Sequence, residues 1–124
     1  MGITAIIIED DIELCEVEKE LLELNDITVI SIGNNGLEAV EMYDKFRPDI
    51  VLMDVRMPKY DGIYGLENIR KINPKAKIIM ITAESNEDTI QKIKDLSASA
   101  LMSKPFDSTI LFKTIDELFY KNEI

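Results

Sequence analysis

The sequence of 124 residues contains no histidine and only one cysteine, and each scarcity excludes a kind of chemistry. Without histidine there can be no Ser-His triad and no imidazole base, and most zinc sites are excluded as well. Cys15 has no second cysteine with which to form an internal disulfide. We therefore expect Cys15 to be a small apolar filler on a helix, in a protein of the reducing cytoplasm.

Long apolar runs and basic clusters are also missing. No run approaches the roughly 20 apolar residues that a membrane-spanning helix needs, and no secretion signal is visible at the N-terminus. The formal net charge is −10, which would repel the phosphate backbone of a nucleic acid. We therefore expect neither direct nucleic-acid binding nor membrane association. With 46% hydrophobic and 31% charged residues, the composition is typical of a globular domain.

Short apolar runs alternate with longer segments of helical periodicity. The length suits one domain (residues 1–124), without a second core or an output domain. The runs are nearly continuous in Ile, Val and Leu, which is typical of strands buried on both faces of a parallel sheet. They predict strands at residues 4–8, 28–32, 50–53, 77–81 and 100–103.

Helices are predicted in the segments that follow the strands. Leu14, Val17, Leu21 and Leu24 recur at helical spacing, which predicts the apolar face of the first helix. The other helical segments comprise residues 37–43, 63–72 and 90–96, and a last helix capped by Asp107 or Ser108. Five strand–helix repeats predict an α/β doubly wound fold, a five-stranded parallel sheet with five helices on both faces.

Polar side chains follow four of the predicted strands. Glu9 and Asp10 follow the first strand, Asp54 the third, Thr82 the fourth and Lys104 the fifth. Sites in open parallel sheets form outside the carboxyl ends of the strands, where the strand order reverses. If the order is 2-1-3-4-5, the first and third strands are neighbours and the three acids share one pocket. Three carboxylates, a hydroxyl and an ammonium group indicate metal-assisted phosphoryl transfer.

These residues belong to motifs that together resemble the receiver domain of two-component response regulators, over the whole length. The motifs are Ile-Ile-Ile-Glu-Asp-Asp at 6–11, Val-Leu-Met-Asp-Val-Arg-Met-Pro at 51–58, Asp-Gly at 61–62, Thr-Ala at 82–83 and Lys-Pro-Phe at 104–106. The resemblance implies a flavodoxin-like sheet with the strand order 2-1-3-4-5. Taken singly, Asp10 or Asp54 could equally well be a helix N-cap, whereas Thr82 alone would more often be a capping hydroxyl and Lys104 alone a surface lysine.

The resemblance also implies a role for each matching residue. Asp54 would be the phosphoacceptor, a carboxylate nucleophile that forms an acyl phosphate. Glu9 and Asp10, with Asp54 and the backbone carbonyl of Arg56, would hold Mg²⁺ or Mn²⁺, because hard cations prefer oxygen ligands. Thr82 and Lys104 would contact the phosphoryl oxygens.

Three neighbouring residues complete the comparison with the family motifs. Pro105 would follow a cis peptide bond that aims Lys104 into the pocket. Gly62 would serve a turn in which a side chain would clash. Asp11 matches no required role, so we expect a solvated or helix-capping acid.

The chain departs from the family pattern at several positions. Leu101 stands where many members have Tyr or Phe, a ring that changes rotamer on activation. We hypothesise that Thr82 still moves towards the phosphoryl group, with a weaker or differently routed response at the surface. Ser97 replaces a common glycine, which predicts slight strain at the end of the preceding helix. Arg56 and Glu84 are expected at the rim of the pocket, where they would tune access of water to the acyl phosphate.

The resemblance favours a phosphorylation switch that receives its phosphoryl group from a histidine kinase or a phosphotransfer protein. The phosphorylated form would change its surface for a downstream protein target, as a monomer or a dimer, or would pass the phosphoryl group onward or drain it as a sink. The runner-up is a free-standing Mg-dependent phosphohydrolase. Arg56 stands where such enzymes often have a second carboxylate, which argues against it. A contact-only binding module and a flavin-binding protein are weaker alternatives, because the site residues are all present and Glu9-Asp10-Asp11 would repel a flavin phosphate.

Overall fold

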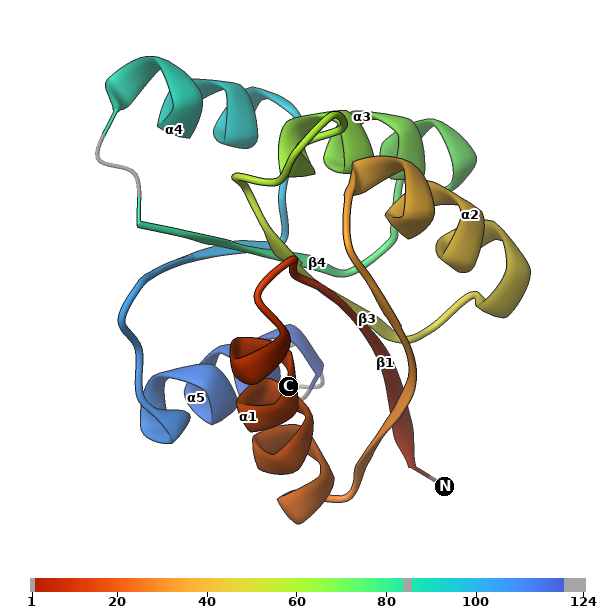
Figure 1. The fold of residues 1–124 in the computed structure, drawn as a ribbon, viewed down its shortest axis with the longest axis vertical. Helices are drawn as coiled ribbons and strands as arrows, with labels where there is room; N and C mark the ends of the chain where they lie inside the picture. Colours follow the sequence, from red (N-terminus) through yellow and green to blue (C-terminus); the bar gives the residue numbers. More distant parts are fainter. Residues whose placement is uncertain (1, 84–85, 120–124) are drawn as a thin grey trace.

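A computed structural model describes residues 2–83 and 86–119, which form a central sheet covered by helices on both faces (Figure 1). The strands are β1 (Ile3–Ile8), β2 (Ile27–Gly33), β3 (Ile50–Asp54), β4 (Ile78–Thr82) and β5 (Ala100–Ser103). The helices are α1 (Ile12–Leu24), α2 (Gly36–Phe46), α3 (Gly62–Ile72), α4 (Glu87–Asp95) and α5 (Ser108–Phe119). All strand pairs are parallel, in the order β2-β1-β3-β4-β5, which confirms the predicted topology.

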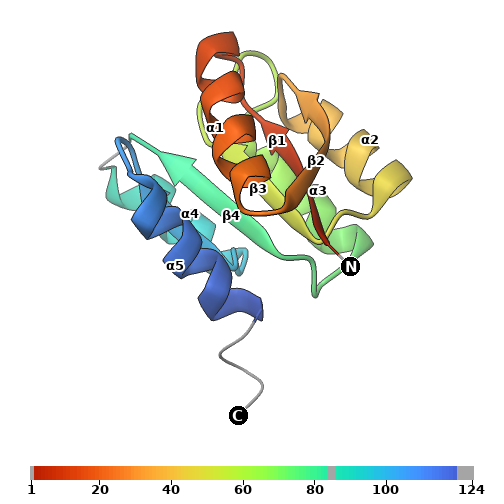
Figure 2. The ribbon, with the colours of Figure 1, turned by 90° about the horizontal axis from the view of Figure 1, so that it is seen from below.

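The helices divide into two layers. Helices α2, α3 and α4 cover one face of the sheet, and α1 and α5 cover the other (Figures 1 and 2). Alternate residues of one strand serve the two layers: Ile6 and Ile8 of β1 join the core beneath α2 and α3, whereas Ala5 and Ile7 join the core beneath α1 and α5. The central strands β3 and β4 are buried at every residue, as their continuous apolar sequences predict. The edge strands β2 and β5 are partly exposed, because each has a neighbour on one side only.

The prediction for the buried face of α1 is partly wrong. Val17 is 53% exposed and Leu24 is 73% exposed, whereas the buried side chains of this helix are Cys15, Glu18 and Leu22. One of the residues that face the sheet is a glutamate. A prediction based on apolar residues alone therefore leaves it out and chooses a neighbouring face of the helix. Cys15 is a buried apolar filler, as predicted.

Acidic side chains cap two of the helices where the sequence indicates. Asp11 accepts a hydrogen bond from the backbone N–H of Leu14 at the start of α1, at 3.2 Å. Asp107 accepts one from the backbone N–H of Ile110 at the start of α5, at 3.0 Å. The capping interpretation of Asp11 and the cap expected at Asp107 are both confirmed. No helix in the described parts of the chain is long and apolar enough to cross a membrane.

Ser97, after the end of α4, adopts a left-handed backbone conformation with φ of 58°. Its carbonyl oxygen accepts hydrogen bonds from Nε and Nη2 of Arg70, at 3.1 and 2.7 Å. Arg70 also donates from Nη1 to the carbonyl oxygen of Ala76, at 2.6 Å. The side chain of Arg70 therefore fixes a turn that a glycine would otherwise favour, and it ties the end of α4 to α3.

Replacing Ser97 with glycine is expected to stabilise the protein by about 1 kcal/mol, because only glycine adopts this conformation without a steric penalty. The measurement is the free energy of unfolding in urea. Ser97→Ala is the control, since alanine keeps the penalty and should give no gain. Equal stability of Ser97→Gly and the original chain would contradict the expected gain and would mean that the additional freedom of glycine in the unfolded chain cancels the steric penalty.

Candidate metal and phosphoryl-transfer site

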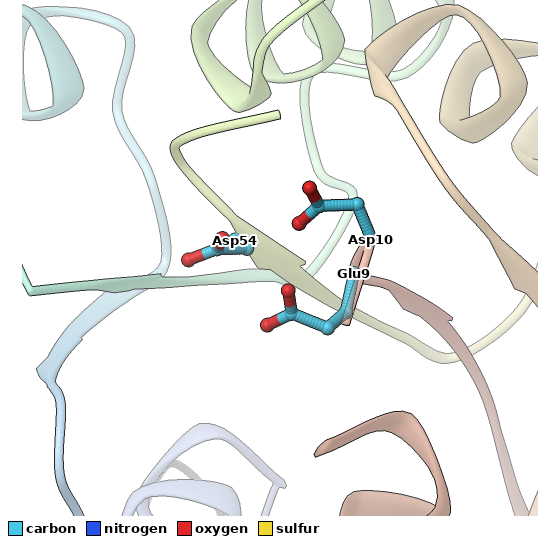
Figure 3. Close-up of side chains that lie close together, drawn as sticks. All are labelled: Glu9, Asp10 and Asp54. Carbon is cyan, nitrogen blue, oxygen red and sulfur yellow. The ribbon is translucent and has the colours of Figure 1, made fainter. Parts of the chain in front are cut away.

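The register of β1 and β3 brings three carboxylates to the same edge of the sheet. Ile8 of β1 pairs with Met53 of β3. The next residues along the two chains, Glu9 and Asp54, therefore lie side by side. One carboxylate oxygen each from Glu9, Asp10 and Asp54 lies within 4.8 Å of the others, and Figure 3 shows the three side chains converging. Glu9 is 3% exposed and Asp54 is 7% exposed, whereas Asp10 is open to solvent. The cluster is therefore a buried pair of acids with a third acid at its mouth.

Lys104 bridges the two buried acids. Its Nζ lies 2.9 Å from Oε1 of Glu9 and 3.1 Å from Oδ1 of Asp54. The backbone N–H of Lys104 donates to the carbonyl oxygen of Thr82 at 2.9 Å, which anchors the residue beside the end of β4. The peptide bond between Lys104 and Pro105 is cis, as the motif predicts. The ammonium group of Lys104 thus lies between Glu9, which is 95 positions earlier in the sequence (104 − 9), and Asp54, which is 50 positions earlier (104 − 54).

Burial and charge act against each other in this cluster. Burial raises the pKa of Glu9, and the hydrogen bonds from Lys104 and from the backbone N–H of Asp11 only partly offset it. Burial likewise raises the pKa of Asp54 more than the hydrogen bond from Lys104 lowers it. For Lys104 burial would lower the pKa, but the hydrogen bonds to Glu9 and Asp54 outweigh it and raise the pKa. The ammonium group is therefore held charged, and the two acids lack sufficient compensating positive charge.

A small pocket of about 240 Å³ opens beside Asp54. It is lined by Asp54, Arg56, Thr82, Ala83 and Lys104. Thr82 is 2% exposed and ends β4, which lies between β3 and β5 in the sheet. A carboxylate, a hydroxyl and an ammonium group therefore border one cavity. The ammonium and hydroxyl groups are suitable donors to phosphoryl oxygens, and the carboxylate is a suitable nucleophile.

The structure places the remaining candidates as follows. Arg56 lines the pocket, as predicted for a rim residue, whereas Glu84 lies outside the described residues. Leu101 is half-buried in β5 and packs with the core on the α4 side of the sheet. The sequence analysis assigned no role to Glu18, which is buried on α1. Its spacing from Cys15 and Leu22, three and four residues away, places it on the same helix face as these two apolar residues and could have identified it.

Gly62 allows α3 to start directly against the end of β3. Its N–H donates to the carbonyl oxygen of Val55 at 2.8 Å. A Cβ atom at this position would overlap the carbonyl oxygen of Asp54 and would lie 2.9 Å from Cα of Val55. The expected clash at Gly62 is confirmed, and it involves the backbone of Asp54 itself.

The family model for the response regulator receiver domain matches residues 5–116. The chain belongs to this family. It is the receiver domain of a two-component system, a phosphorylation-dependent signalling switch that interacts with kinases and downstream targets. Domains of this family bind Mg²⁺ at an acidic pocket, and Glu9, Asp10 and Asp54 form such a pocket here.

Several relatives support this assignment of the receiver domain. Protein CcdB of Bacillus subtilis is 32% identical over 116 residues, covering 93% of this chain and 97% of CcdB. The chemotaxis protein CheY of Listeria monocytogenes is 30% identical, covering 90% of this chain and 94% of CheY. The probable C4-dicarboxylate response regulator DctR of Priestia megaterium is 36% identical over 104 residues, 83% of this chain, but these span only 46% of DctR.

Among solved structures, the receiver domain is similar to a chain in the CheX-CheY-BeF3-Mg²⁺ complex from Borrelia burgdorferi. The TM-score is 0.90 and the sequence identity is 27%, covering 96% of this chain and 90% of that one. A DNA-binding response regulator of the LuxR family from Staphylococcus aureus gives a TM-score of 0.87 at 26% identity, covering 94% of this chain and 98% of that one. The same fold therefore occurs in proteins with different outputs, so the output of this chain has to be argued from its own residues.

Proposed function

We propose that Asp54 is the phosphoacceptor of this receiver domain. Its carboxylate borders the 240 Å³ pocket with Thr82 and Lys104, and the Lys104 ammonium group 3.1 Å from its Oδ1 favours the ionised form. One oxygen of Asp54 would attack the phosphorus of a phosphohistidine on a histidine kinase or phosphotransfer protein. The new P–O bond forms as the P–N bond breaks, and the imidazole leaves with the electron pair of that bond. No separate base is needed, because the nucleophile carries no proton.

The donor set fits a divalent cation, Mg²⁺ or Mn²⁺. Glu9, Asp10 and Asp54 carry three negative charges when ionised and Lys104 carries one positive charge, which leaves −2 (−3 + 1) at the site. Three oxygen donors, one of them exposed, suit an ion that prefers oxygen and retains several waters. The backbone carbonyl of Arg56 is the fourth protein ligand that we propose. When bound, the cation would neutralise the carboxylates and the charge on the transferring phosphoryl group.

Lys104 and Thr82 would stabilise the product. The Lys104 ammonium group, already 3.1 Å from Oδ1 of Asp54, is placed to pair with a phosphoryl oxygen, and the Thr82 hydroxyl would donate a hydrogen bond to another. A shift of Thr82 would change the packing of Leu101 on the α4 side of the sheet. This change would alter the surface offered to a downstream protein, with the domain monomeric or dimerising on phosphorylation.

The same chemistry serves an output switch, a relay that passes the phosphoryl group onward, or a phosphate sink. We propose that the chain acts in the cytoplasm through protein contacts, and that its net charge of −10 disfavours direct binding to nucleic acid. A free-standing Mg-dependent phosphohydrolase is the weaker candidate, because Arg56 rather than a second carboxylate lines the Asp54 pocket.

Incubation with Mg²⁺ and acetyl phosphate is expected to add one phosphoryl group to the intact protein, as measured by mass spectrometry. The gain should disappear in Asp54→Asn and after chelation with EDTA, because the nucleophile or the cation is then missing. Asp116→Asn, which alters an exposed acid of α5, is the matched control and should be phosphorylated normally.

A phosphoryl group retained in Asp54→Asn would contradict our assignment of the acceptor. No gain in a protein that demonstrably binds Mg²⁺ would instead favour a module that acts by contact alone, or a site that requires its own kinase. The convergence of Glu9, Asp10, Asp54 and Lys104 is the observation that carries the proposed function.

A further inference from the structure

Glu18 is a carboxyl group in the buried face of α1. The residue is 1% exposed and lies between Cys15 and Leu22 in the stripe that faces the sheet. Its Oε2 is the only fully buried side-chain nitrogen or oxygen within residues 2–83 and 86–119 that has no hydrogen-bond partner. Burying a charged carboxylate without compensation costs several kcal/mol or more, so such a group is normally neutral or paired. The stability of the fold alone does not account for an acid at this position.

The charges that act on Glu18 belong to the candidate site. They are Glu9 after β1, Lys104 after β5, Asp54 at the end of β3 and Asp11 at the start of α1 itself. Burial raises the pKa of Glu18 to about 8; the negative charge of Glu9 adds to this effect and the positive charge of Lys104 opposes it. Cys15, the other titratable group of the stripe, has a pKa raised to about 11 by burial and by Glu18, and so stays neutral.

A divalent cation at the carboxylate cluster would change this balance. With the site at −2, an ionised carboxylate at Glu18 is repelled by the negative charges of Glu9, Asp54 and Asp11. Two added positive charges remove that repulsion and favour the ionised form. Binding of the cation and ionisation of Glu18 must then assist each other, because linkage between two binding events is reciprocal.

We propose that Glu18 carries a proton in the metal-free protein and releases it when a divalent cation binds to Glu9, Asp10 and Asp54. The O–H bond of the Glu18 carboxyl group breaks, the carboxylate remains buried, and the proton passes to the buffer. Glu18 is thus a positioning residue. Its negative charge raises the affinity of the cluster for the cation, and its side chain is not a ligand of the cation. This inference rests on the proposed metal site.

The linkage predicts a pH-dependent affinity for the metal. The affinity for Mg²⁺ should rise about fivefold between about pH 7 and pH 9 beyond the rise expected from the ligands alone, because Glu18 loses its proton over that range. In Glu18→Gln the amide has similar shape but cannot ionise, so this additional rise should be absent. Glu16→Gln, which changes an exposed glutamate on the same helix, is the matched control and should behave as the original chain does.

Calorimetric titration of the full chain with MgCl₂ at pH 7.5, in two buffers of different ionisation enthalpy, counts the protons released for each cation bound. The original chain and Glu16→Gln should release about half a proton more than Glu18→Gln, because a midpoint that falls from about 8 by about one unit lies on either side of pH 7.5. Equal proton release from all three would overturn the role of Glu18. A chain that binds no Mg²⁺ would overturn the proposed metal site and this inference together, so the binding curve and the proton count separate the two failures.

A second measurement uses the unaltered protein, in case Glu18→Gln folds poorly. The ¹³C resonance of the Glu18 carboxyl group should titrate near neutral pH without metal, and its midpoint should fall by about one pH unit in saturating Mg²⁺. A midpoint in the ordinary range of glutamate, or one that Mg²⁺ leaves unchanged, would overturn the inference.

Discussion

Replacing Lys104 with methionine is expected to destabilise the metal-free protein by about 3 kcal/mol at neutral pH. Methionine retains most of the aliphatic volume but removes the ammonium group that lies 2.9 Å from Glu9 and 3.1 Å from Asp54. Both buried carboxylates then lose their cationic partner and keep only backbone hydrogen bonds, and this accounts for the size of the effect. Lys113→Met, which removes an exposed lysine of α5, is the control and should change stability by less than about 0.5 kcal/mol.

The loss in Lys104→Met should depend on pH in a defined direction. Burial raises the pKa values of Glu9 and Asp54 above 4.5 and 3.8, so the folded state binds protons more tightly than the unfolded chain. Stability therefore falls as the pH rises from these ordinary values through the folded values, and removal of Lys104 extends that fall to higher pH. The pKa of Lys104 is raised above 10.5, so the original ion pair remains intact throughout this range.

Urea unfolding of Lys104→Met and the original chain at pH 5 and pH 7.5 measures this effect. The difference between the two proteins should be smaller at pH 5, where the acids are more easily protonated. Added MgCl₂ should also reduce the difference at pH 7.5, since the cation replaces part of the missing positive charge. A difference that is equal at both pH values would contradict our account of the carboxylate pair.

Gly62→Ala is expected to cost about 3 kcal/mol of unfolding free energy and to prevent phosphorylation of Asp54. The added methyl group would overlap the carbonyl oxygen of Asp54 and approach Cα of Val55, so one of the two backbone segments must move. That movement displaces the nucleophile from Lys104 and Thr82. Urea unfolding and the mass gain with acetyl phosphate and Mg²⁺ report the two effects.

Gly2→Ala provides the matched control for Gly62→Ala. The nearest atom to its added Cβ is the carbonyl oxygen of Asp26, at 3.3 Å, so a small local adjustment is sufficient. A Gly62→Ala protein that retains full stability and is phosphorylated normally would show that α3 can begin further from β3 than the structure indicates.

The arrangement of the site was largely predictable from the sequence, for a geometric reason. Parallel strands place their carboxyl ends along one edge of the sheet, so Asp10, Asp54 and Lys104 had to lie near one another once the strand order was assumed. The contact between Lys104 and Glu9 spans 95 positions, yet both residues follow strands that the apolar runs identify.

Features that depend on side-chain packing could not be predicted in the same way. The buried face of α1 was misassigned because a glutamate occupies an inward position, and no periodicity rule expects an unpaired carboxyl group there. The hydrogen bonds from Arg70 to Ser97 join residues 27 positions apart through a long, flexible side chain. The sequence indicated the missing glycine at Ser97, but it could not show which side chain compensates for it.

Helices α3 and α4, which cover the same face of the sheet (Figure 1), differ in how many of their residues are buried. Helix α3 buries four residues, whereas α4 buries Ile93 alone. Two of the four in α3, Leu66 and Ile69, are large apolar side chains and the other two are glycines. Since a buried side chain of this size contributes about 1.5–3 kcal/mol, displacing α4 requires less free energy than displacing α3 by about one such side chain. Arg70 also fastens the chain just beyond the C-terminal end of α4 through its hydrogen bonds to Ser97. Any displacement of α4 would therefore work mainly against the burial of Ile93 and against these hydrogen bonds.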